Sequence, residues 1–291
     1  MLIAARNAIL AGGAAPAAYG GLCFTAEAAN SSVQLTAVDS PPAVTLVKSF
    51  DGINWEAYAV GEVIDIPSTG DLVYLAAGEG GNESFGSSTS AYHKFVINGL
   101  VAASGDITSL RRFDLEQTTL AVYCYNSMFQ GCTGLTSAPE LPATTLVASC
   151  YRSMFQGCTG LTSAPELPAT KLAVFCYDSM FQGCTGLTSA PELPATKLMA
   201  FCYGSMFKGC TGLTSAPELP ATKLKTSCYA SMFNGCTDLS LIKVHFTAWG
   251  SETAGWVTSV SSAGTFYKPT ALTEEYETSK IPIGWTVVNI E

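Results

Sequence analysis

Short apolar runs separated by turn-forming residues fill the chain between residues 22 and 98. Runs this short, divided by Gly, Pro, Asp and Ser, are typical of β-strands. They cover residues 22–28, 33–38, 44–49, 55–58, 63–66, 72–76 and 94–97. Strands of this length and spacing predict a small all-β, sandwich-like domain over residues 21–98.

A strict repeat replaces this pattern in the middle of the chain. Residues 131–144 return almost unchanged at 157–170, 183–196 and 209–222, a period of 26 residues. A further copy begins at Cys228, and residues 115–120 match 141–146 at the same period. A fixed period of this length is typical of a solenoid, whose units bury their apolar faces against their neighbours. We therefore predict a solenoid over residues 99–246 that begins with a transition unit.

The remaining segments flank this repeat. The aromatic and irregular residues 247–291 predict a C-terminal cap that covers the last open unit. Residues 1–20 are apolar, but Arg6 follows apolar residues, and Gly12, Gly13 and Pro16 interrupt the run. This favours a retained N-terminal arm over a cleaved secretion signal, which is the alternative.

Ten of the 11 cysteines lie in two columns of the repeat, eight residues apart within a unit. On a helix, Cys124, Met128 and Cys132 would share one face, so we expect a helix that turns them into the core. The helical rise places such cysteines about 12 Å apart, too far for a disulfide. We therefore expect reduced, buried thiols. A zinc site is the alternative, but it lacks paired CxxC spacing and has only His93 and His245 to add. The expected core set is Cys124, Met128, Cys132, Cys150, Cys158, Cys176, Cys184, Cys202, Cys210, Cys228 and Cys236.

Three positions of the unit differ between copies. They are the residue after the tyrosine, the residue four places further on, and the residue before the first cysteine. On a helix, a residue two places from the buried column lies on the opposite face. We therefore expect the first two positions to face solvent. Aromatic residues at the third position predict an aromatic column. The candidate binding residues are Tyr123, Asn126, Arg152, Phe175, Asp178, Phe201 and Lys208. The alternative is drift at unconstrained surface sites after duplication.

Charge and hydropathy restrict the classes of molecule that the protein is expected to bind. The formal net charge is −9 and only 13% of residues are charged, with no basic run. Nucleic acid and anionic lipid both require clustered Lys and Arg, so neither is expected as a partner. No apolar stretch reaches the 18 or so residues of a membrane span.

The order Cys-Tyr-x-Ser-Met-Phe-x-Gly-Cys-Thr-x-Leu resembles the BspA-like leucine-rich repeats. Cys124, Met128-Phe129, Cys132 and Leu135 take the places of that family's apolar residue, Ala-Phe, Cys and Leu. The resemblance implies an α/β solenoid of the leucine-rich-repeat type, used for adhesion or partner recognition and without catalytic residues. A β-domain followed by such repeats is similar to proteins of gut Bacteroidetes and of their phages.

Motifs of catalysis are absent from the sequence. There is no Gly-x-x-x-x-Gly-Lys, His-Glu-x-x-His or Gly-x-Ser-x-Gly, so we expect no enzyme activity, cofactor or metal. The loop at 78–83 fits no calcium-ligand spacing. The hypothesis is a non-enzymatic recognition or structural protein, a phage virion appendage that binds a host-surface glycan or protein. A secreted or surface-anchored bacterial adhesin is the first alternative, and a glycan-active enzyme is the second.

The hypothesis also sets a location and an assembly. We expect the virion surface, or the extracellular cell surface if the protein is bacterial. The N-terminal region would contact other virion or surface proteins. Because fibres of this kind are commonly oligomeric, we expect a homo-oligomer.

Overall fold

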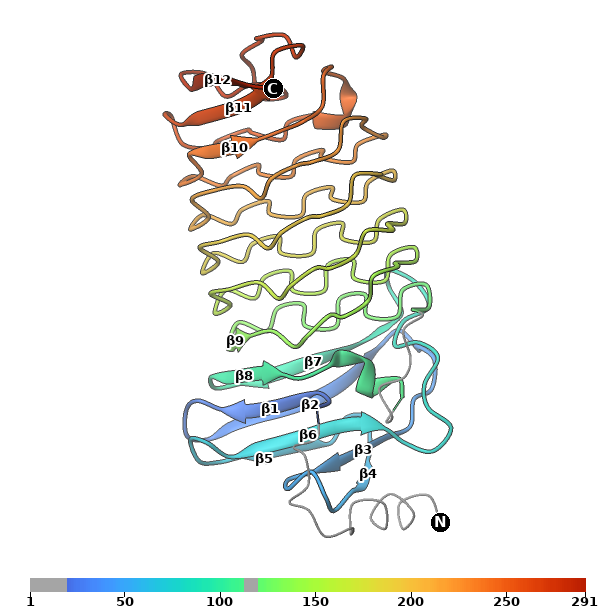
Figure 1. Cartoon of the computed structure of the whole chain (residues 1–291). Helices are drawn as coiled ribbons and strands as arrows, with labels where there is room; N and C mark the ends of the chain where they lie inside the picture. Colours follow the sequence, from blue (N-terminus) through green and yellow to red (C-terminus); the bar gives the residue numbers. More distant parts are fainter. Residues whose placement is uncertain (1–19, 113–119) are drawn as a thin grey trace.

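The computed structural model describes residues 20–112 and 120–291 (Figure 1). The predicted arm at 1–20 lies outside the described residues except for Gly20, and so does the transition unit at 115–120 except for Leu120. In the described residues the chain forms β-strands, two short 3₁₀ helices and long runs of turns. The strands are β1 (Cys23–Ala26), β2 (Ser31–Val38), β3 (Leu46–Ser49), β4 (Glu56–Tyr58), β5 (Val63–Ile66), β6 (Leu72–Ala77), β7 (Tyr92–Asn98), β8 (Val101–Ser104), β9 (Leu135–Ser137), β10 (Leu241–Lys243), β11 (Thr265–Pro269) and β12 (Thr286–Ile290). The 3₁₀ helices are η1 (Ile107–Leu110) and η2 (Ser251–Thr253).

The N-terminal part consists of two sheets over one core. One sheet has the order β4-β3-β6-β1-β8-β9 and the other has the order β5-β2-β7. Alternate side chains of β2 and β7 turn inward, which is the period of two that a half-buried strand requires. The rings of Phe24 on β1 and Phe95 on β7 meet across the two sheets, with centroids 4.9 Å apart. Each of the seven predicted runs overlaps one strand, whereas no run covers β8.

Both layers of this β-domain continue into the first repeat unit. β8 pairs in parallel with β9, which places Val101 opposite Leu135. On the other layer, the Phe95 N–H donates to the Met128 carbonyl at 2.7 Å. One hydrophobic core therefore runs without a break from Leu22 to Trp285.

The segment from 121 to 132 is a run of turns. The N–H groups of Tyr125, Ser127 and Phe129 donate to carbonyls of the next unit at 2.8–2.9 Å. The N–H groups between them donate three residues back along the chain. Every fourth residue has a positive φ: 57° at Tyr123, 56° at Ser127 and 78° at Gly131. A left-handed residue at this interval prevents an α-helix from propagating.

The predicted α/β solenoid of the leucine-rich-repeat type is therefore wrong. The described residues contain no α-helix, and the three sheets are small, so that none of them extends through the repeat units. Two features of the repeat explain this. The left-handed residues break the expected helix, and Pro139 and Pro142 have no N–H to donate to a sheet. The fold is β-rich, and turns rather than helices connect its repeats.

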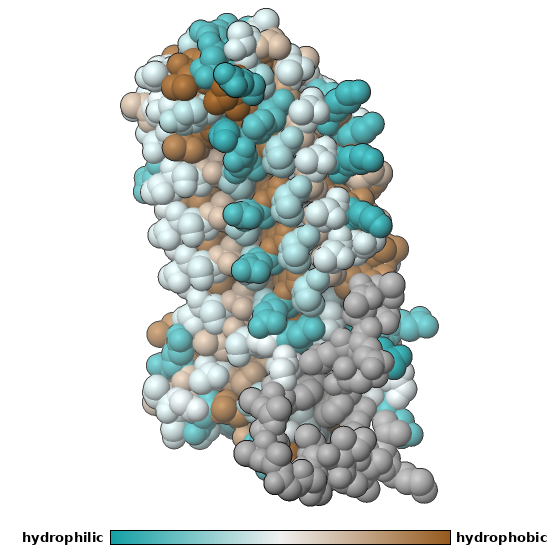
Figure 2. All heavy atoms as spheres, viewed as in Figure 1, coloured by the Kyte–Doolittle hydropathy of each residue, from teal (hydrophilic) through white to brown (hydrophobic). Residues whose placement is uncertain are grey.

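The repeat units lie on one another in register (Figure 1). Equivalent side chains of successive units touch. The rings of Phe129 and Phe155 are 5.4 Å apart and nearly parallel, and the rings of Tyr151 and Tyr177 are 5.9 Å apart. Figure 2 shows hydrophilic side chains recurring at regular steps on one face of this stack. The 26-residue period thus appears as columns of like residues.

The cysteine columns lie inside the stack. All eleven cysteines are buried free thiols. One column donates S–H bonds between units: Cys158 Sγ to the Phe129 carbonyl and Cys184 Sγ to the Phe155 carbonyl, each at 3.0 Å. No group of three or more His, Cys, Asp or Glu within 20–112 and 120–291 is placed to hold a metal ion.

The C-terminal segment continues the stack with shorter units. β10, β11 and β12 form a parallel sheet. The Phe233 N–H donates to the Trp256 carbonyl at 2.9 Å, as each earlier unit does to the next. The indole of Trp256 is fully buried and lies 6.1 Å from the ring of Phe233. Large aromatic rings therefore fill the end of the core where the repeat decays.

Candidate functional site

The turn runs of successive units lie side by side and form one surface, which we call the turn face. It consists of residues 121–132, 147–158, 173–184, 199–210 and 225–236. In the run at 225–236 two buried residues alternate with two that are turned outward, because the run turns every four residues, whereas the run at 121–132 is buried from Cys124 to Phe129. All seven predicted binding residues belong to this face.

Four of the seven predicted residues touch one another across three neighbouring units. The rings of Phe175 and Phe201 are stacked, with centroids 4.7 Å apart and planes at 17°. The guanidinium carbon of Arg152 lies 5.3 Å from the centroid of the Phe175 ring. Arg152 Nε donates to Asp178 Oδ2 at 3.1 Å. We call Arg152, Phe175, Asp178 and Phe201 the divergent cluster, since the repeats differ at these positions.

The surroundings of Asp178 are adapted to its carboxylate. Burial raises the pKa of Asp178, while the Arg152 charge acts against this shift. The next unit has Gly204 at the equivalent position, where a Cβ would lie only 2.8 Å from Asp178 Oδ1. A side chain larger than hydrogen at residue 204 would therefore press on the carboxylate. The three neighbouring units carry side chains that fit one another.

The other three predicted residues lie apart from this cluster. Asn126 is only 2% exposed because the loop before β7 covers it, and its Nδ2 donates to the Ser88 carbonyl at 3.3 Å. The expectation that this position faces solvent is therefore wrong for Asn126, and it is wrong for Asp178, which is 9% exposed. Tyr123 is half-buried and separated from Phe175 by Ser149, so the aromatic column is only a pair. Lys208 is half-buried in the column that holds glutamine in earlier units.

Glutamine side chains form a second column on the turn face. Gln130 Nε2 donates to Gln156 Oε1, and the Tyr92 hydroxyl donates to Gln130 Oε1 at 3.2 Å. Gln182 continues the column to the next unit. Amide groups of this kind both donate and accept hydrogen bonds, so they extend the polar part of the face beyond the divergent cluster.

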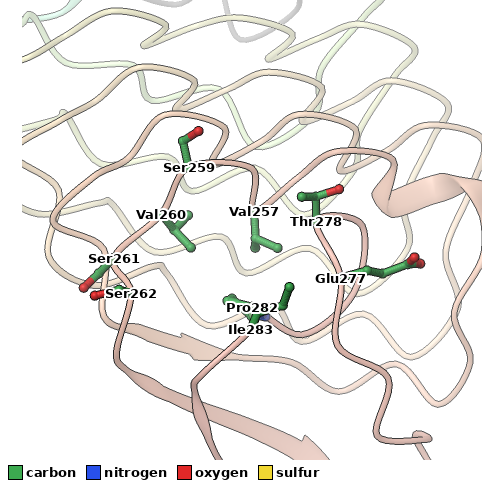
Figure 3. Close-up of a pocket in the computed structure, with 9 residues that line it drawn as sticks. All are labelled: Val257, Ser259, Val260, Ser261, Ser262, Glu277, Thr278, Pro282 and Ile283. Atoms are coloured by element: carbon green, nitrogen blue, oxygen red, sulfur yellow. The ribbon is translucent and has the colours of Figure 1, made fainter.

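Two hollows elsewhere lack convergent chemistry. A groove of about 420 Å³ lies between prolines and glutamates of units two and three, but its residues recur unchanged from unit to unit. A pocket of about 180 Å³ lies between residues 257–262 and 277–283, and Figure 3 shows the residues that line it. Among the residues drawn only Glu277 is charged, and its carboxylate already lies 3.2 Å from Lys280 Nζ.

A further pocket lies beside Trp249, next to the last repeat unit. It has a volume of about 290 Å³ and both acidic and basic residues on its rim. Sequence reasoning assigned Trp249 only to the cap. The sequence holds no signal for this pocket, because Trp249, Lys223 and Glu252 come together only when the last full repeat folds against the shorter unit that follows.

The helices found in residues 20–112 and 120–291 are single 3₁₀ turns, far shorter than a helix that spans a membrane. Comparison with protein-family models, with curated proteins and with solved structures found no match to this chain. The adhesive function implied by the resemblance to BspA-like repeats therefore stays a prediction.

Proposed function

We propose that the protein is a non-enzymatic recognition protein that binds a glycan or a protein on a bacterial surface through the turn face. In this proposal it is an appendage of a phage particle. The N-terminal region attaches it to other virion proteins, and several copies assemble together. A secreted or surface-anchored bacterial adhesin would use the same face.

The observation that carries this proposal is the contact among divergent residues. The repeat units share most of their sequence, and independent drift at the positions that differ would leave the side chains there unrelated to one another. Instead, Arg152 pairs with Asp178 and covers Phe175, and Gly204 leaves room for Asp178. Differences that fit one another indicate that this part of the face was shaped as a unit.

The backbone at the two phenylalanines supports a role in binding. Phe175 and Phe201 have φ values of 57° and 55°, which bulky side chains rarely adopt. A left-handed conformation costs a residue with a Cβ about 1–2 kcal/mol. Ser149 and Ser227 occupy the equivalent places in other units, so the fold itself does not need a ring there. A half-buried aromatic pair that the fold does not require is suited to contact another molecule.

The test uses residues that the repeats themselves supply. Labelled protein is incubated with a panel of gut Bacteroidetes strains, and bound fluorescence per cell is measured by flow cytometry. In the test variant, Phe175→Ser and Phe201→Ser introduce the residue that other units have at this position, as Ser149 and Ser227. The stack should therefore still form. We expect cell binding to fall at least tenfold.

A matched control separates the turn face from the rest of the surface. Glu192→Ala changes an exposed residue of the proline groove and should leave cell binding unchanged. Equal loss in both variants, or full binding by the double serine variant, would remove the turn face as the binding surface. Absence of binding to every strain would favour a purely architectural role.

A further inference from the structure

The pocket beside Trp249 has the composition of a binding site for a small polar ring. It lies between residues 222–224 of unit five and residues 246–252, with a volume of about 290 Å³. This volume lies at the lower end of the roughly 300–1,000 Å³ that small-molecule pockets span, which suits a single ring rather than a larger ligand. Its lining includes Thr222, Lys223, Phe246, Thr247, Trp249 and Glu252.

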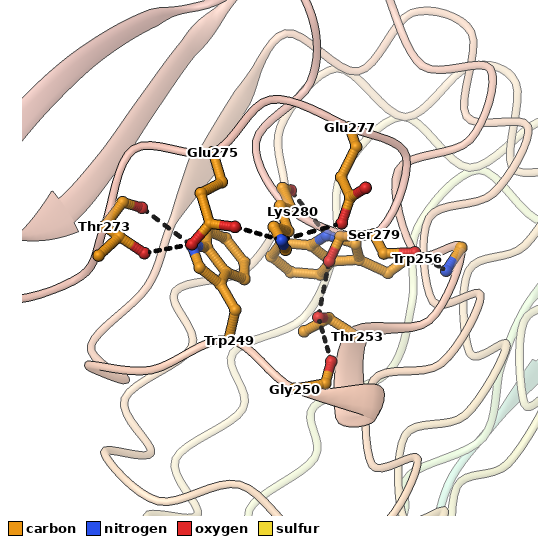
Figure 4. A network of polar contacts seen from close by, with 10 residues as sticks. Trp249, Gly250, Thr253, Trp256, Thr273, Glu275, Glu277, Ser279 and Lys280 are labelled. Carbon is orange, nitrogen blue, oxygen red and sulfur yellow. Dashed lines mark hydrogen bonds and ion pairs between the residues drawn. The ribbon is translucent and has the colours of Figure 1, made fainter.

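The Trp249 side chain is held in a fixed orientation. Its indole N–H donates to the Thr273 carbonyl at 2.9 Å, and its ring meets the edge of Phe246 at 5.4 Å. Figure 4 shows that Thr273 is in turn bonded to Glu275, which pairs with Lys280. The Lys280 carbonyl accepts the indole N–H of Trp256 at 2.8 Å. A half-buried indole fixed in this way loses little conformational freedom when a ligand stacks on it.

The rim of the pocket offers both donors and acceptors. Neither the Lys223 ammonium nor the Glu252 carboxylate forms an ion pair within the described part of the chain. Thr222 and Thr247 are exposed and add hydroxyl groups. One positive and one negative charge leave the rim neutral overall.

Gly250 makes room for the Glu252 carboxylate. A Cβ on residue 250 would lie 2.0 Å from Glu252 Oε2. The φ of Gly250 is −165°, an extended value that any residue adopts, so the glycine is needed for space and not for backbone freedom. The Glu252 carboxylate can therefore occupy this position only because residue 250 has no side chain.

We propose that this pocket binds the ring of a neutral hexopyranose. The apolar C–H face of such a ring would stack on the Trp249 indole. Its hydroxyl groups would accept from Lys223 and the threonines and donate to Glu252. A rim without net charge gives a charged sugar no net attraction that would offset the cost of removing its charge from water, so it favours neutral sugars. This inference rests on the proposed recognition function and gives it a ligand class and a second site.

The test measures binding of simple sugars to the full chain. Methyl glycosides of glucose, galactose and mannose are titrated by ligand-observed NMR, with the amino sugar and the uronic acid of each configuration as charged probes. We expect at least one neutral glycoside to bind, and the charged sugar of the same configuration to bind at least tenfold more weakly. If no neutral glycoside binds, or if a charged sugar binds more tightly, the proposal is overturned.

Variants locate the bound sugar. Glu252→Gln and Gly250→Ala should each lower the affinity for the bound glycoside at least tenfold. Gly250→Ala acts only by displacing a flexible carboxylate, so this variant should fold. Lys223→Met should do the same, whereas Lys197→Met, at the equivalent place one unit earlier, should have no effect. Unchanged affinity in the first three variants would show that the sugar binds elsewhere.

The two proposals fail separately. If cell binding depends on Phe175 and Phe201 but no glycoside binds the protein, only the Trp249 pocket is refuted. If glycosides bind at Trp249 but the double serine variant still binds cells, the turn face is refuted and the pocket stands.

Discussion

At the scale of single residues, the tyrosines of the turn runs differ in what their hydroxyl groups meet. Five tyrosines form a buried column, one from each unit, with neighbouring rings about 6 Å apart. At the N-terminal end, the Tyr125 hydroxyl donates to the Ile107 carbonyl at 3.3 Å. The hydroxyls of Tyr151 and Tyr203 are buried without a hydrogen-bond partner among the described residues.

Removing a buried hydroxyl should therefore have opposite effects at two positions of this column. An unsatisfied buried donor costs about 1–3 kcal/mol, so Tyr151→Phe should leave stability unchanged or raise it by up to about 1 kcal/mol. Tyr125→Phe removes a bonded hydroxyl and its hydrogen bond to the Ile107 carbonyl, so it should lower stability by about 1 kcal/mol. Urea unfolding followed by tyrosine and tryptophan fluorescence measures both.

Tyr203→Phe serves as the replicate, since its hydroxyl is in the same state as that of Tyr151. A loss of 1 kcal/mol or more (about a fivefold shift in the folding equilibrium) in both Tyr151→Phe and Tyr203→Phe would show that these hydroxyls have partners in solution.

The candidate site could be predicted from the sequence only in part. Aligning the units places Arg152 next to Asp178 and Phe175 next to Phe201, and the structure brings these four together. The same alignment says nothing of residues from other parts of the chain. The loop that covers Asn126 precedes β7, and the neighbours of Trp249 come from units of different length, so both features required the folded chain.

At the scale of elements, the sequence predicted correctly which residues of the turn run are buried, but the helix it predicted there is wrong. Cys124, Met128 and Cys132 are buried at intervals of four, as a helical face would require. A run that turns every four residues has the same interval, and period alone does not separate the two. The distinguishing signal is the residue at the fourth place, Ser127 and then Gly131, where the chain is left-handed.

Substitutions at this fourth place test the turn run. Ser205 has a φ of 51°, and glycine there would relieve about 1 kcal/mol of strain while losing a similar amount to chain entropy. We therefore expect Ser205→Gly to change stability by less than about 1 kcal/mol. Ser205→Val places a β-branched side chain in the left-handed region and should cost at least about 1–2 kcal/mol. Thermal unfolding followed by circular dichroism gives both values.

A helix at this position would give the reverse order, because glycine is worse than valine inside a helix. The far-ultraviolet spectrum of the wild-type protein provides a second check on the same point. It should lack the paired minima of α-helix. Strong helical minima, or a Ser205→Gly variant less stable than Ser205→Val, would restore the helical interpretation.

At the scale of the whole molecule, the buried thiols act together. Burial raises the pKa of Cys124, Cys132 and Cys176 from an ordinary value of 9.0 to about 12. Burial also raises the pKa of Cys150 and Cys158 well above that value. Because the two columns run through every repeat unit, the entire stack shares this property.

Stability should consequently fall at alkaline pH. The unfolded chain releases thiol protons near pH 9, while the folded chain holds them until about pH 12. The stabilisation is fully present below pH 9 and is lost as the pH rises from about 9 to about 12. At pH 10 each such thiol lowers the free energy of unfolding by about 1.4 kcal/mol. Melting temperatures measured from pH 7 to pH 11 in reducing buffer test this.

Replacement of one thiol gives the control. Cys158→Ala removes one of the titrating groups, so its stability should decline less steeply with pH than that of the wild type. A melting temperature that stays level from pH 8 to pH 10.5 would mean that the thiols are solvated in the native state. Rapid labelling of the folded protein by a thiol reagent at pH 8 would lead to the same conclusion.

The constant register between units has one more consequence. Each repeat presents to the unit after it the same carbonyls, rings and thiols that it receives from the unit before it. Loss or gain of one complete copy would therefore leave the buried contacts of every remaining junction as they are now, although it would alter the divergent cluster if it removed one of its units. The distance between the β-domain and the Trp249 pocket could change in fixed increments while both ends kept their form, so the gene could adjust the reach of the molecule by recombination between its own copies.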